Sequence, residues 1–224
     1  MPKKLSKQTL ALSPSSTTLS STTTSSSSLP ALLASPSLPL PRLIVFDLDY
    51  TLWPFWVDTH VTPPLKPNAQ RSSATDRCGE DFAFYSDVPA ILQTLPQAGG
   101  GGATQIKLGV ASRTSAPGLA RDLLKMLHLP PVDEGDKVRR ALDVFDGGLE
   151  IYPGSKIRHF ETLQKRTGIR FEDMLFFDDE SRNQETEKLG VTMRLVRDGV
   201  TWDEVERGVE EWRRRRGYGI REGS

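Results

Sequence analysis

The stretch that decides the fold is Leu43-Ile44-Val45-Phe46-Asp47-Leu48-Asp49-Tyr50-Thr51. Its first four residues are apolar and polar residues follow at once, which predicts a short buried strand. Residues i and i+2 of an extended chain point the same way, so Asp47 and Asp49 should converge just past this strand, where open α/β sheets bind ligands. Two close carboxylates repel each other unless a cation or a shared proton offsets their charge. The pair therefore indicates either a site of chemistry or an ordinary acidic turn, and the rest of the chain must decide between them.

Three further apolar runs, which start at residues 106, 149 and 174, also end in polar clusters. Each cluster precedes a segment that could be helical, and this alternation predicts an α/β fold with a doubly wound, mostly parallel sheet. Parallel units bring successive strand ends to one edge of such a sheet. One by one, the polar residues could be helix caps or a solvated surface lysine. Their joint occurrence is harder to explain in that way, and the shared edge would gather Asp47, Asp49, Ser112, Lys156, Asp178 and Asp179.

The order and spacing of these residues resemble the haloacid dehalogenase superfamily of phosphotransferases. Four longer blocks, at residues 46–60, 111–114, 151–156 and 176–180, look like the eukaryotic magnesium-dependent phosphatase family. The resemblance covers residues 41–212 and says nothing about the first forty residues. It implies a haloacid dehalogenase-like fold and a phosphatase that uses Mg²⁺.

The two acids of the first block suit a nucleophile and its proton-transfer partner. A carboxylate nucleophile splits a hard hydrolysis into two easier steps. Asp47 would attack phosphorus and form an aspartyl-phosphate, while Asp49 would protonate the leaving oxygen and then deprotonate the attacking water. An Asp at the second position resembles the phosphohydrolases of the superfamily, whereas ion-pumping relatives carry Thr there and dehalogenases lack the second acid.

The phosphoryl group needs positioning and charge neutralisation, because negative charge is spread over its oxygens. Lys156 would supply a point charge and Ser112 a hydroxyl, and backbone N–H groups after the first strand, at Leu48, would add donors. Arg113 would hold the phosphate or a neighbouring polar group with its planar fork. Its alternative is an ion pair with a carboxylate such as Glu180.

The acid cluster fits a hard cation with oxygen ligands, and Mg²⁺ typically uses one or two carboxylates plus substrate phosphate and waters. Asp47 would bind the ion directly, and Asp49 would bind it through its carbonyl, as in such families. Asp178 and Asp179 would complete the site. We favour Asp179 as the direct ligand of that pair.

Residues 53–85 separate the first strand from the next expected helix, and they include Pro54, Pro63, Pro64 and Pro67. So irregular a segment predicts a small flap rather than a full helical cap domain. Trp53 and Phe55 are explained as well by the core as by a site. Trp56 and His60 are better candidates for the entrance of a site, and the resemblance suggests that Trp56 packs against the leaving group.

The composition points to one domain plus extensions, since the chain has 224 residues. Its 29 basic and 29 acidic residues balance, so no global field draws it to nucleic acid or to a membrane. The single cysteine, Cys78, excludes an internal disulfide and a zinc site built on several cysteines. A reducing, cytoplasmic compartment is the simpler inference, and we expect a monomer.

The first forty residues differ from the rest, because they are rich in Ser, Thr and Pro. We expect residues 1–40 to form a disordered leader, so that deletion of residues 1–39 leaves stability unchanged. The leader carries three lysines and no acid, which also permits a mitochondrial transit peptide. The phosphatase domain should then occupy residues 41–217, followed by a tail at 218–224.

The function that these patterns favour is a Mg²⁺-dependent phosphomonoester hydrolase that works through an aspartyl-phosphate. Its partner would be a small phosphorylated substrate or a phosphoprotein, and the resemblance suggests phosphotyrosine proteins or sugar phosphates. One alternative is a non-enzymatic phosphate-sensing or scaffold protein on the same fold. Another is a receiver domain like those of response regulators, whose phospho-acceptor usually follows a separate middle strand rather than belonging to the first acid pair.

Overall fold

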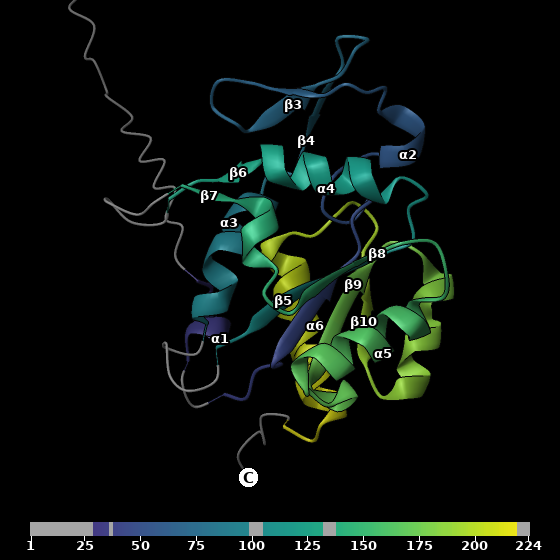
Figure 1. The fold of residues 1–224 in the computed structure, drawn as a ribbon. Coiled ribbons are helices and arrows are strands. Elements are labelled where there is room, and N and C mark those ends of the chain that lie inside the picture. Colours follow the sequence, from purple (N-terminus) through teal and green to yellow (C-terminus); the bar gives the residue numbers. More distant parts are fainter. Residues whose placement is uncertain (1–28, 36–37, 99–104, 132–137, 219–224) are drawn as a thin grey trace, which may run out of the picture.

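A five-stranded sheet forms the centre of the computed structural model, which describes residues 29–35, 38–98, 105–131 and 138–218 (Figure 1). The strand order is β10-β9-β1-β5-β8, and every neighbouring pair is parallel. The doubly wound, mostly parallel sheet expected from the sequence is therefore confirmed. Its strands are β1 (Leu43–Phe46), β5 (Lys107–Ser112), β8 (Gly148–Ile151), β9 (Met174–Asp178) and β10 (Thr192–Leu195).

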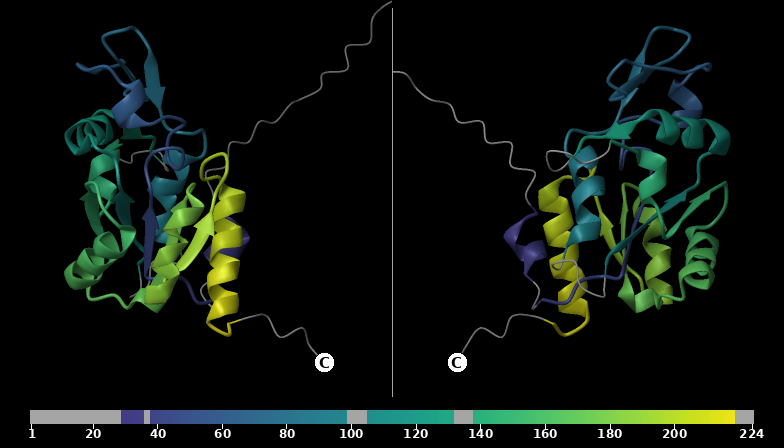
Figure 2. Two further views of the ribbon diagram at one scale, coloured as in Figure 1. Left: turned by 90° about the vertical axis from the view of Figure 1, so that its right-hand side faces the viewer. Right: turned by 60° about the vertical axis from the view of Figure 1, so that its left-hand side comes forward.

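Helices cover both faces of the sheet, because neighbouring side chains of β1 point to opposite sides. Ile44 and Phe46 share one buried cluster with α3 (Val88–Thr94), α4 (Pro117–Met126) and α6 (Trp202–Arg215). Leu43 and Val45 belong to a second cluster with α5 (Lys156–Thr167), beside which lies the 3₁₀ segment η4 (Ser181–Leu189). Figure 2 shows the sheet between these layers. A strand covered on both faces must be apolar throughout, which explains the unbroken run in β1.

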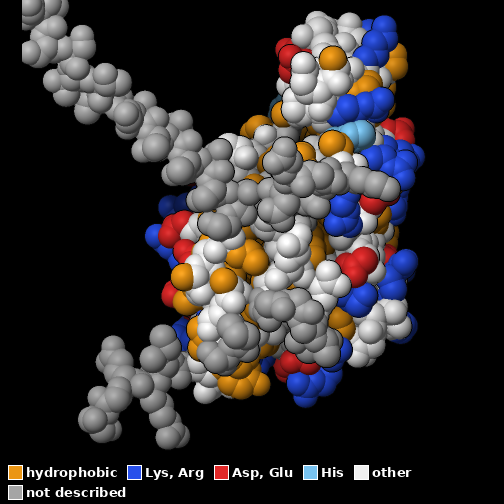
Figure 3. Space-filling model, turned by 90° about the vertical axis from the view of Figure 1, so that its left-hand side faces the viewer, with side chains coloured by type: hydrophobic (Ala, Val, Ile, Leu, Met, Phe, Trp, Pro, Cys, Tyr) orange, Lys and Arg blue, Asp and Glu red, His pale blue; other side chains and the backbone are white. Residues whose placement is uncertain are grey.

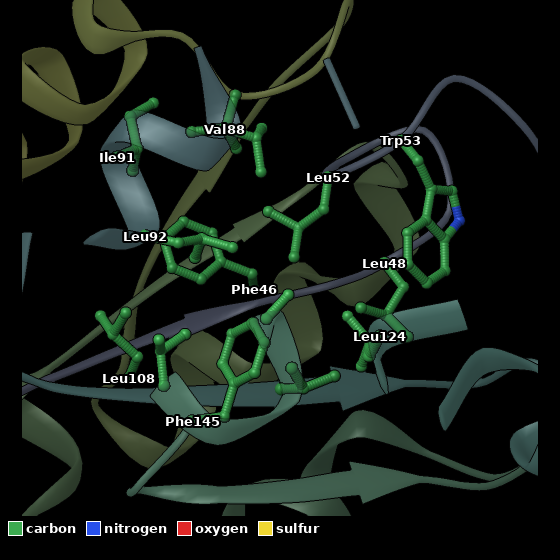
Figure 4. Close-up of a cluster of buried hydrophobic side chains, with 14 of the residues drawn as sticks. Phe46, Leu48, Leu52, Trp53, Val88, Ile91, Leu92, Leu108, Leu124 and Phe145 are labelled. Atoms are coloured by element: carbon green, nitrogen blue, oxygen red, sulfur yellow. The ribbon is translucent and has the colours of Figure 1, made fainter. Parts of the chain in front are cut away.

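The larger cluster continues from β1 into the turn that carries the two acids (Figure 4). Phe46 stacks on Phe177 of β9, with ring centroids 5.4 Å apart. Leu48, Leu52 and Trp53 are fully buried around the same centre. The residues between and after the acids therefore anchor the turn in the core, which fixes where the carboxylates emerge.

The flap lies above the carboxyl ends of the strands (Figure 1). It consists of the short helix α2 (Val57–His60) and a three-stranded antiparallel sheet of β2 (Lys66–Pro67), β3 (Ser73–Thr75) and β4 (Asp81–Ala83). Its size agrees with the small flap expected. Trp53 and Phe55 are buried and stacked on each other, with ring centroids 5.4 Å apart, so both belong to the core.

The remaining elements are short and connect the larger ones. The pair β6 (His128–Leu129) and β7 (Arg139–Arg140) is antiparallel, and the amide of His128 donates to the carbonyl of Arg71 in the flap. Leucines recur at helical spacing within residues 118–129, which predicts a helix over this range. However, α4 ends at Met126 because the backbone is extended at Leu127. The other short turns are η1 (Leu95–Gln97), η2 (Ala141–Val144) and η3 (Phe171–Asp173).

The surface carries both signs of charge. Figure 3 shows one face of the molecule, on which basic and acidic side chains both appear among hydrophobic ones. Within the described residues, no helix is both long enough and apolar enough to cross a membrane.

The folded region begins earlier than residue 41, where the sequence predicts the start of the domain. The helix α1 (Ala31–Ala34) places Leu33 in the core with no exposed surface. Arg213 of α6 donates from Nε to the carbonyl of Pro39 at 2.8 Å and from Nη2 to that of Leu32 at 3.2 Å. The overall Ser and Thr content concealed the few leucines that dock. Residues 1–28 of the expected leader and 219–224 of the expected tail lie outside the described residues.

Deletion of residues 1–39 should therefore lower the stability of the domain, contrary to the expectation from composition. Removing the buried side chain of Leu33 alone should cost about 2–5 kcal/mol of unfolding free energy. Deletion of residues 1–28 is the matched control, because it leaves α1 and the contacts of Arg213 in place. We expect the melting temperature to fall for the longer deletion and to stay within about 1 °C for the shorter one. Equal melting temperatures for both would show that α1 does not dock.

Candidate active site

The turn after β1 presents Asp47 and Asp49 at the carboxyl edge of the sheet, 8% and 9% exposed. The amide of Leu52 donates to the carbonyl of Leu48 at 2.8 Å, so the chain reverses at once. Oδ1 of Asp49 accepts from Nε1 of Trp53 at 2.7 Å and from the amide of Val57 at 3.2 Å. Its Oδ2 receives no hydrogen bond from a described residue, and this oxygen remains for a proton or a ligand.

Lys156 is the first residue of α5 and is 1% exposed, so it is not a solvated surface lysine. The helix begins here because the hydroxyl of Ser155 accepts from the amide of Ile157 at 3.2 Å. Nζ of Lys156 lies 2.6 Å from Oδ1 of Asp47 and 3.0 Å from Oδ2 of Asp178, and it also donates to the carbonyl of Ala111. One ammonium group thus joins the ends of three strands.

Asp178 ends β9 and is fully buried. Its Oδ1 accepts from the amide of Glu180 at 2.8 Å, and Nδ2 of Asn183 lies 2.9 Å from Oδ1 and 2.8 Å from Oδ2. Asn183 is a site residue that the sequence analysis missed. It stands in a polar segment without apolar periodicity, and no motif signalled it.

Three carboxylates form a cluster that could hold a metal ion. Asp47, Asp178 and Asp179 each offer an oxygen, and these oxygens lie within 4.8 Å of one another. Such a set of oxygens suits Mg²⁺. The carboxylate of Asp49 stands outside this cluster, held by Trp53 and Val57, and its expected contribution through the carbonyl stays a prediction.

The electrostatics of the cluster favour a bound cation. Burial raises the pKa of Asp47, nearby Asp178 raises it further, and Lys156 opposes both. Burial also raises the pKa of Asp179 to about 6, with added repulsion from Asp178. Burial alone would lower the pKa of Lys156, but Asp47 and Asp178 outweigh it and the pKa rises. The negative charge in the cluster thus exceeds what one ammonium offsets, and a divalent cation would relieve it.

Asp49 differs from the clustered acids in its surroundings. Burial raises its pKa to about 6, against the hydrogen bonds from Trp53 and Val57. A carboxyl group with such a pKa can hold a proton near neutral pH and can also take one up. This property suits a group that must act first as an acid and then as a base.

A cleft of about 320 Å³ opens onto these groups. Of the residues singled out in the sequence, those that line it are Asp47, Asp49, Trp56, Ser112, Arg113, Lys156 and Asp179. Leu48 does not line it with its side chain, which is buried in the core, but no described group accepts a hydrogen bond from its amide. Further lining residues that the sequence analysis did not select are Asp58, Thr59, Thr114, Glu180 and Arg182.

The rim of the cleft contains an exposed aromatic ring. Trp56 is 48% exposed, and it meets the edge of Tyr50 at 5.1 Å and stacks on His60 at 5.6 Å between ring centroids. Trp56 therefore does not belong to the core. The short helix α2, which contains His60, also contains Asp58. Oδ2 of Asp58 accepts hydrogen bonds from the amide of Ser115 at 3.0 Å and from the hydroxyl of Ser115 at 2.7 Å. These bonds join the flap to the loop that follows Ser112.

The arginines of the rim have different partners. Nη1 of Arg113 donates to Oδ1 of Asn183 at 3.2 Å, so Arg113 does not form the ion pair with Glu180 that was its alternative. Arg182 takes that carboxylate instead, with two contacts of 2.6 Å. The other N–H groups of the Arg113 guanidinium form no hydrogen bond with a described residue, and Arg113 lines the cleft.

Comparison with known proteins gives consistent matches. A family model described as Acid Phosphatase matches residues 39–215. Magnesium-dependent phosphatase 1 of Homo sapiens is 45% identical over 172 residues, which are 76% of this chain and 86% of the relative. A HAD-like hydrolase superfamily protein of Schizosaccharomyces pombe is 43% identical over 157 residues, 70% of this chain and 86% of the relative.

Among solved structures, a phosphatase domain from Bacteroides fragilis complexed with Mg matches 79% of this chain and 40% of its own, with a TM-score of 0.44 and 17% identity. A likeness at that level adds nothing to the assignment, which rests on the family model and the two relatives. The model spans most of the chain, and both relatives are aligned over most of their length. The chain therefore belongs to the magnesium-dependent phosphatase family of the haloacid dehalogenase superfamily, and it is a phosphatase that uses Mg²⁺.

Proposed function

We propose that this phosphatase hydrolyses phosphate monoesters through an aspartyl-phosphate on Asp47. The observation that carries the proposal is the contrast between the two acids of the first turn. Asp47 lies 2.6 Å from Lys156 inside the charged cluster. Asp49 stands beside it, its Oδ2 accepts no hydrogen bond from the described residues, and burial raises its pKa to about 6. This contrast supports Asp47 as the attacking group and Asp49 as the group that carries the proton.

In the first step an oxygen of Asp47 bonds to phosphorus, the ester P–O bond breaks, and Asp49 gives its proton to the leaving oxygen. In the second step water attacks phosphorus, Asp49 takes a proton from the water, and phosphate leaves Asp47. Lys156, the Ser112 hydroxyl and the Leu48 amide would hold the phosphoryl oxygens. Bound Mg²⁺ supplies charge neutralisation, and Asp47, Asp178, Asp179 and the carbonyl of Asp49 would hold it.

The substrates that we propose are phosphotyrosine proteins or sugar phosphates. The exposed ring of Trp56 offers an apolar wall beside the phosphate position. The rest of the lining is polar and includes Thr59, Thr114 and Arg182, whose side chains would hydrogen-bond to hydroxyl groups of a sugar or to the backbone of a peptide. A panel of phosphosugars and phosphotyrosine peptides, assayed for kcat/KM, tests this choice.

The mechanism is tested by trapping the acyl-phosphate. We expect turnover of a small aryl phosphate with Mg²⁺ and none after chelation with EDTA. Acid quenching during turnover, followed by borohydride reduction and mass spectrometry, should place the modification on Asp47. Turnover without a trapped intermediate would contradict the acyl-phosphate route, and phosphate binding without turnover would favour the sensing or scaffold function.

Substitutions at Trp56 and Arg113 should separate leaving-group contacts from phosphate contacts. We expect Trp56→Ala to change kcat/KM little for a minimal aryl phosphate and to lower it about tenfold or more for the preferred larger substrate, because an exposed ring acts on the leaving group. Arg113→Ala should weaken both substrates, since Arg113 lies nearer the group that they share. An equal loss on both substrates for Trp56→Ala, together with a large drop in melting temperature, would show a structural role instead.

A further inference from the structure

Asn183 lies buried between the acid cluster and the substrate-side arginine. The residue is 1% exposed. Its Nδ2 faces both oxygens of Asp178, at 2.9 and 2.8 Å, and its Oδ1 accepts from Nη1 of Arg113 at 3.2 Å. The amide can lie only this way round, because a flip would set its oxygen against a carboxylate and its NH₂ group against a guanidinium. Its orientation is therefore set from both sides.

The backbone holds Asn183 in place independently of these contacts. Its amide donates to the carbonyl of Glu180 at 3.0 Å, and the hydroxyl of Thr186 donates to its carbonyl at 3.0 Å. Both bonds belong to the start of η4, which packs on α5. A side chain that is fixed at its base and engaged at both polar atoms can transmit a displacement from one neighbour to the other.

We infer that Asn183 is a positioning residue that couples the metal-binding carboxylate of Asp178 to the guanidinium of Arg113. The inference rests on the proposed function, in which Arg113 contacts phosphate and Asp178 helps to hold Mg²⁺. Together with Lys156 and the amide of Glu180, Asn183 occupies the protein-side hydrogen-bonding positions of Asp178 and so sets how that carboxylate meets the ion. Groups that orient a metal ligand in this way typically contribute about 10–100-fold in metal affinity or activity.

A purely structural role would give a different pattern. A buried side chain that only fills space can be replaced by an apolar one of similar volume with little effect on metal binding. Asn183→Leu keeps the number of side-chain heavy atoms and the branching at Cγ, with a larger volume, and removes both polar contacts. We expect it to weaken Mg²⁺ binding about tenfold or more, measured by calorimetry in phosphate-free buffer, with circular dichroism to confirm the fold. Asn183→Ala replaces it in the experiment if Asn183→Leu does not fold.

The coupling itself is measured by a double-mutant cycle on Mg²⁺ affinity. The effect of Arg113→Ala is compared in the wild-type and Asn183→Leu backgrounds, and we expect the two effects to differ by about threefold or more. Lys107→Ala is the matched control, because it removes a cationic side chain whose ion pair, with Asp146 at 3.1 Å, involves neither Asn183 nor a partner of Asn183. Its effect should be the same in both backgrounds.

Two results would overturn the inference. One is an Asn183→Leu protein whose Mg²⁺ affinity stays within about twofold of the wild type, and the other is a cycle in which Arg113 and Asn183 act independently. The proposed function fails differently, because it predicts turnover and a trapped aspartyl-phosphate in the wild-type protein. Calorimetry reads the coupling whether or not the wild type turns over a given ester.

Discussion

The Asp47→Asn variant is expected to lose at least about 10⁴-fold in kcat while it keeps its fold. An amide has nearly the shape of the carboxylate but cannot attack phosphorus, and it removes one negative charge from the metal cluster. Burial, with added repulsion from Asp178, raises the pKa of Asp47 although Lys156 opposes both, so a neutral side chain at this position should not make the folded protein much less stable. Turnover of an aryl phosphate at saturating Mg²⁺ and the melting temperature are the two measurements.

Asp58→Asn serves as the control for this experiment. Asp58 lines the same cleft, but its Oδ2 is bonded to Ser115, and an amide oxygen can still accept that bond. We expect this variant to keep most of its activity. Near-normal turnover by Asp47→Asn would disprove the assignment of the nucleophile, since the amide of the variant cannot attack phosphorus.

The Lys156→Met variant should be strongly destabilised when no metal is bound. It leaves the buried carboxylates of Asp47 and Asp178 without their ammonium partner, and breaking a buried pair in this way costs about 3–5 kcal/mol. For a chain of this size each kcal/mol lowers the melting temperature by about 2–4 °C. We expect a drop of about 10 °C in EDTA, part of which Mg²⁺ restores because it offsets the same charges.

The pH dependence of this loss follows from the same charges. Burial already raises the pKa of Asp47, and without Lys156 this pKa lies still higher, so protonation neutralises Asp47 at a higher pH. The difference in stability from the wild type should therefore shrink as the pH falls through that range. Lys107→Met is the control, since Lys107 pairs with Asp146 at the surface, 43% and 54% exposed, and such pairs contribute at most about 1 kcal/mol. Equal effects of the two substitutions would contradict the buried charge network.

The residues that gather at the carboxyl edge of the sheet could be predicted, because their position depends on the order of strands and helices along the chain and not on individual side-chain contacts. Apolar runs ending in polar clusters located β1, β5, β8 and β9, and parallel connection brought Asp47, Ser112 and Lys156 to one edge. The burial of Lys156 was not predictable from its own neighbourhood, since it follows from the two carboxylates of distant strands. The resemblance supplied the roles, which neither periodicity nor spacing contains.

Three features escaped prediction for identifiable physical reasons. Leu33 docks on the domain from within a segment whose average composition argues against folding, because one fully buried leucine, with Leu29 and Leu40 packed against the same cluster, is enough to hold it. Asn183 acts through its amide in a 3₁₀ segment that has no apolar stripe, so no periodic signal marks its inward side. The pairing of Glu180 with Arg182 could not be predicted from the sequence either, because Arg113 and Arg182 both line the same cleft.

The flap is joined to the body of the protein at two points beside the cleft, from Val57 to Asp49 and from Asp58 to Ser115. We expect a cleft held in this way to keep its shape when an ester binds, without a closing motion. We expect the rate of substrate association to be set by diffusion and by charge. We also expect phosphate to dissociate without an opening motion of the flap. For the phosphoproteins among the proposed substrates, we expect the phosphorylated side chain to enter and leave while the rest of that protein stays outside.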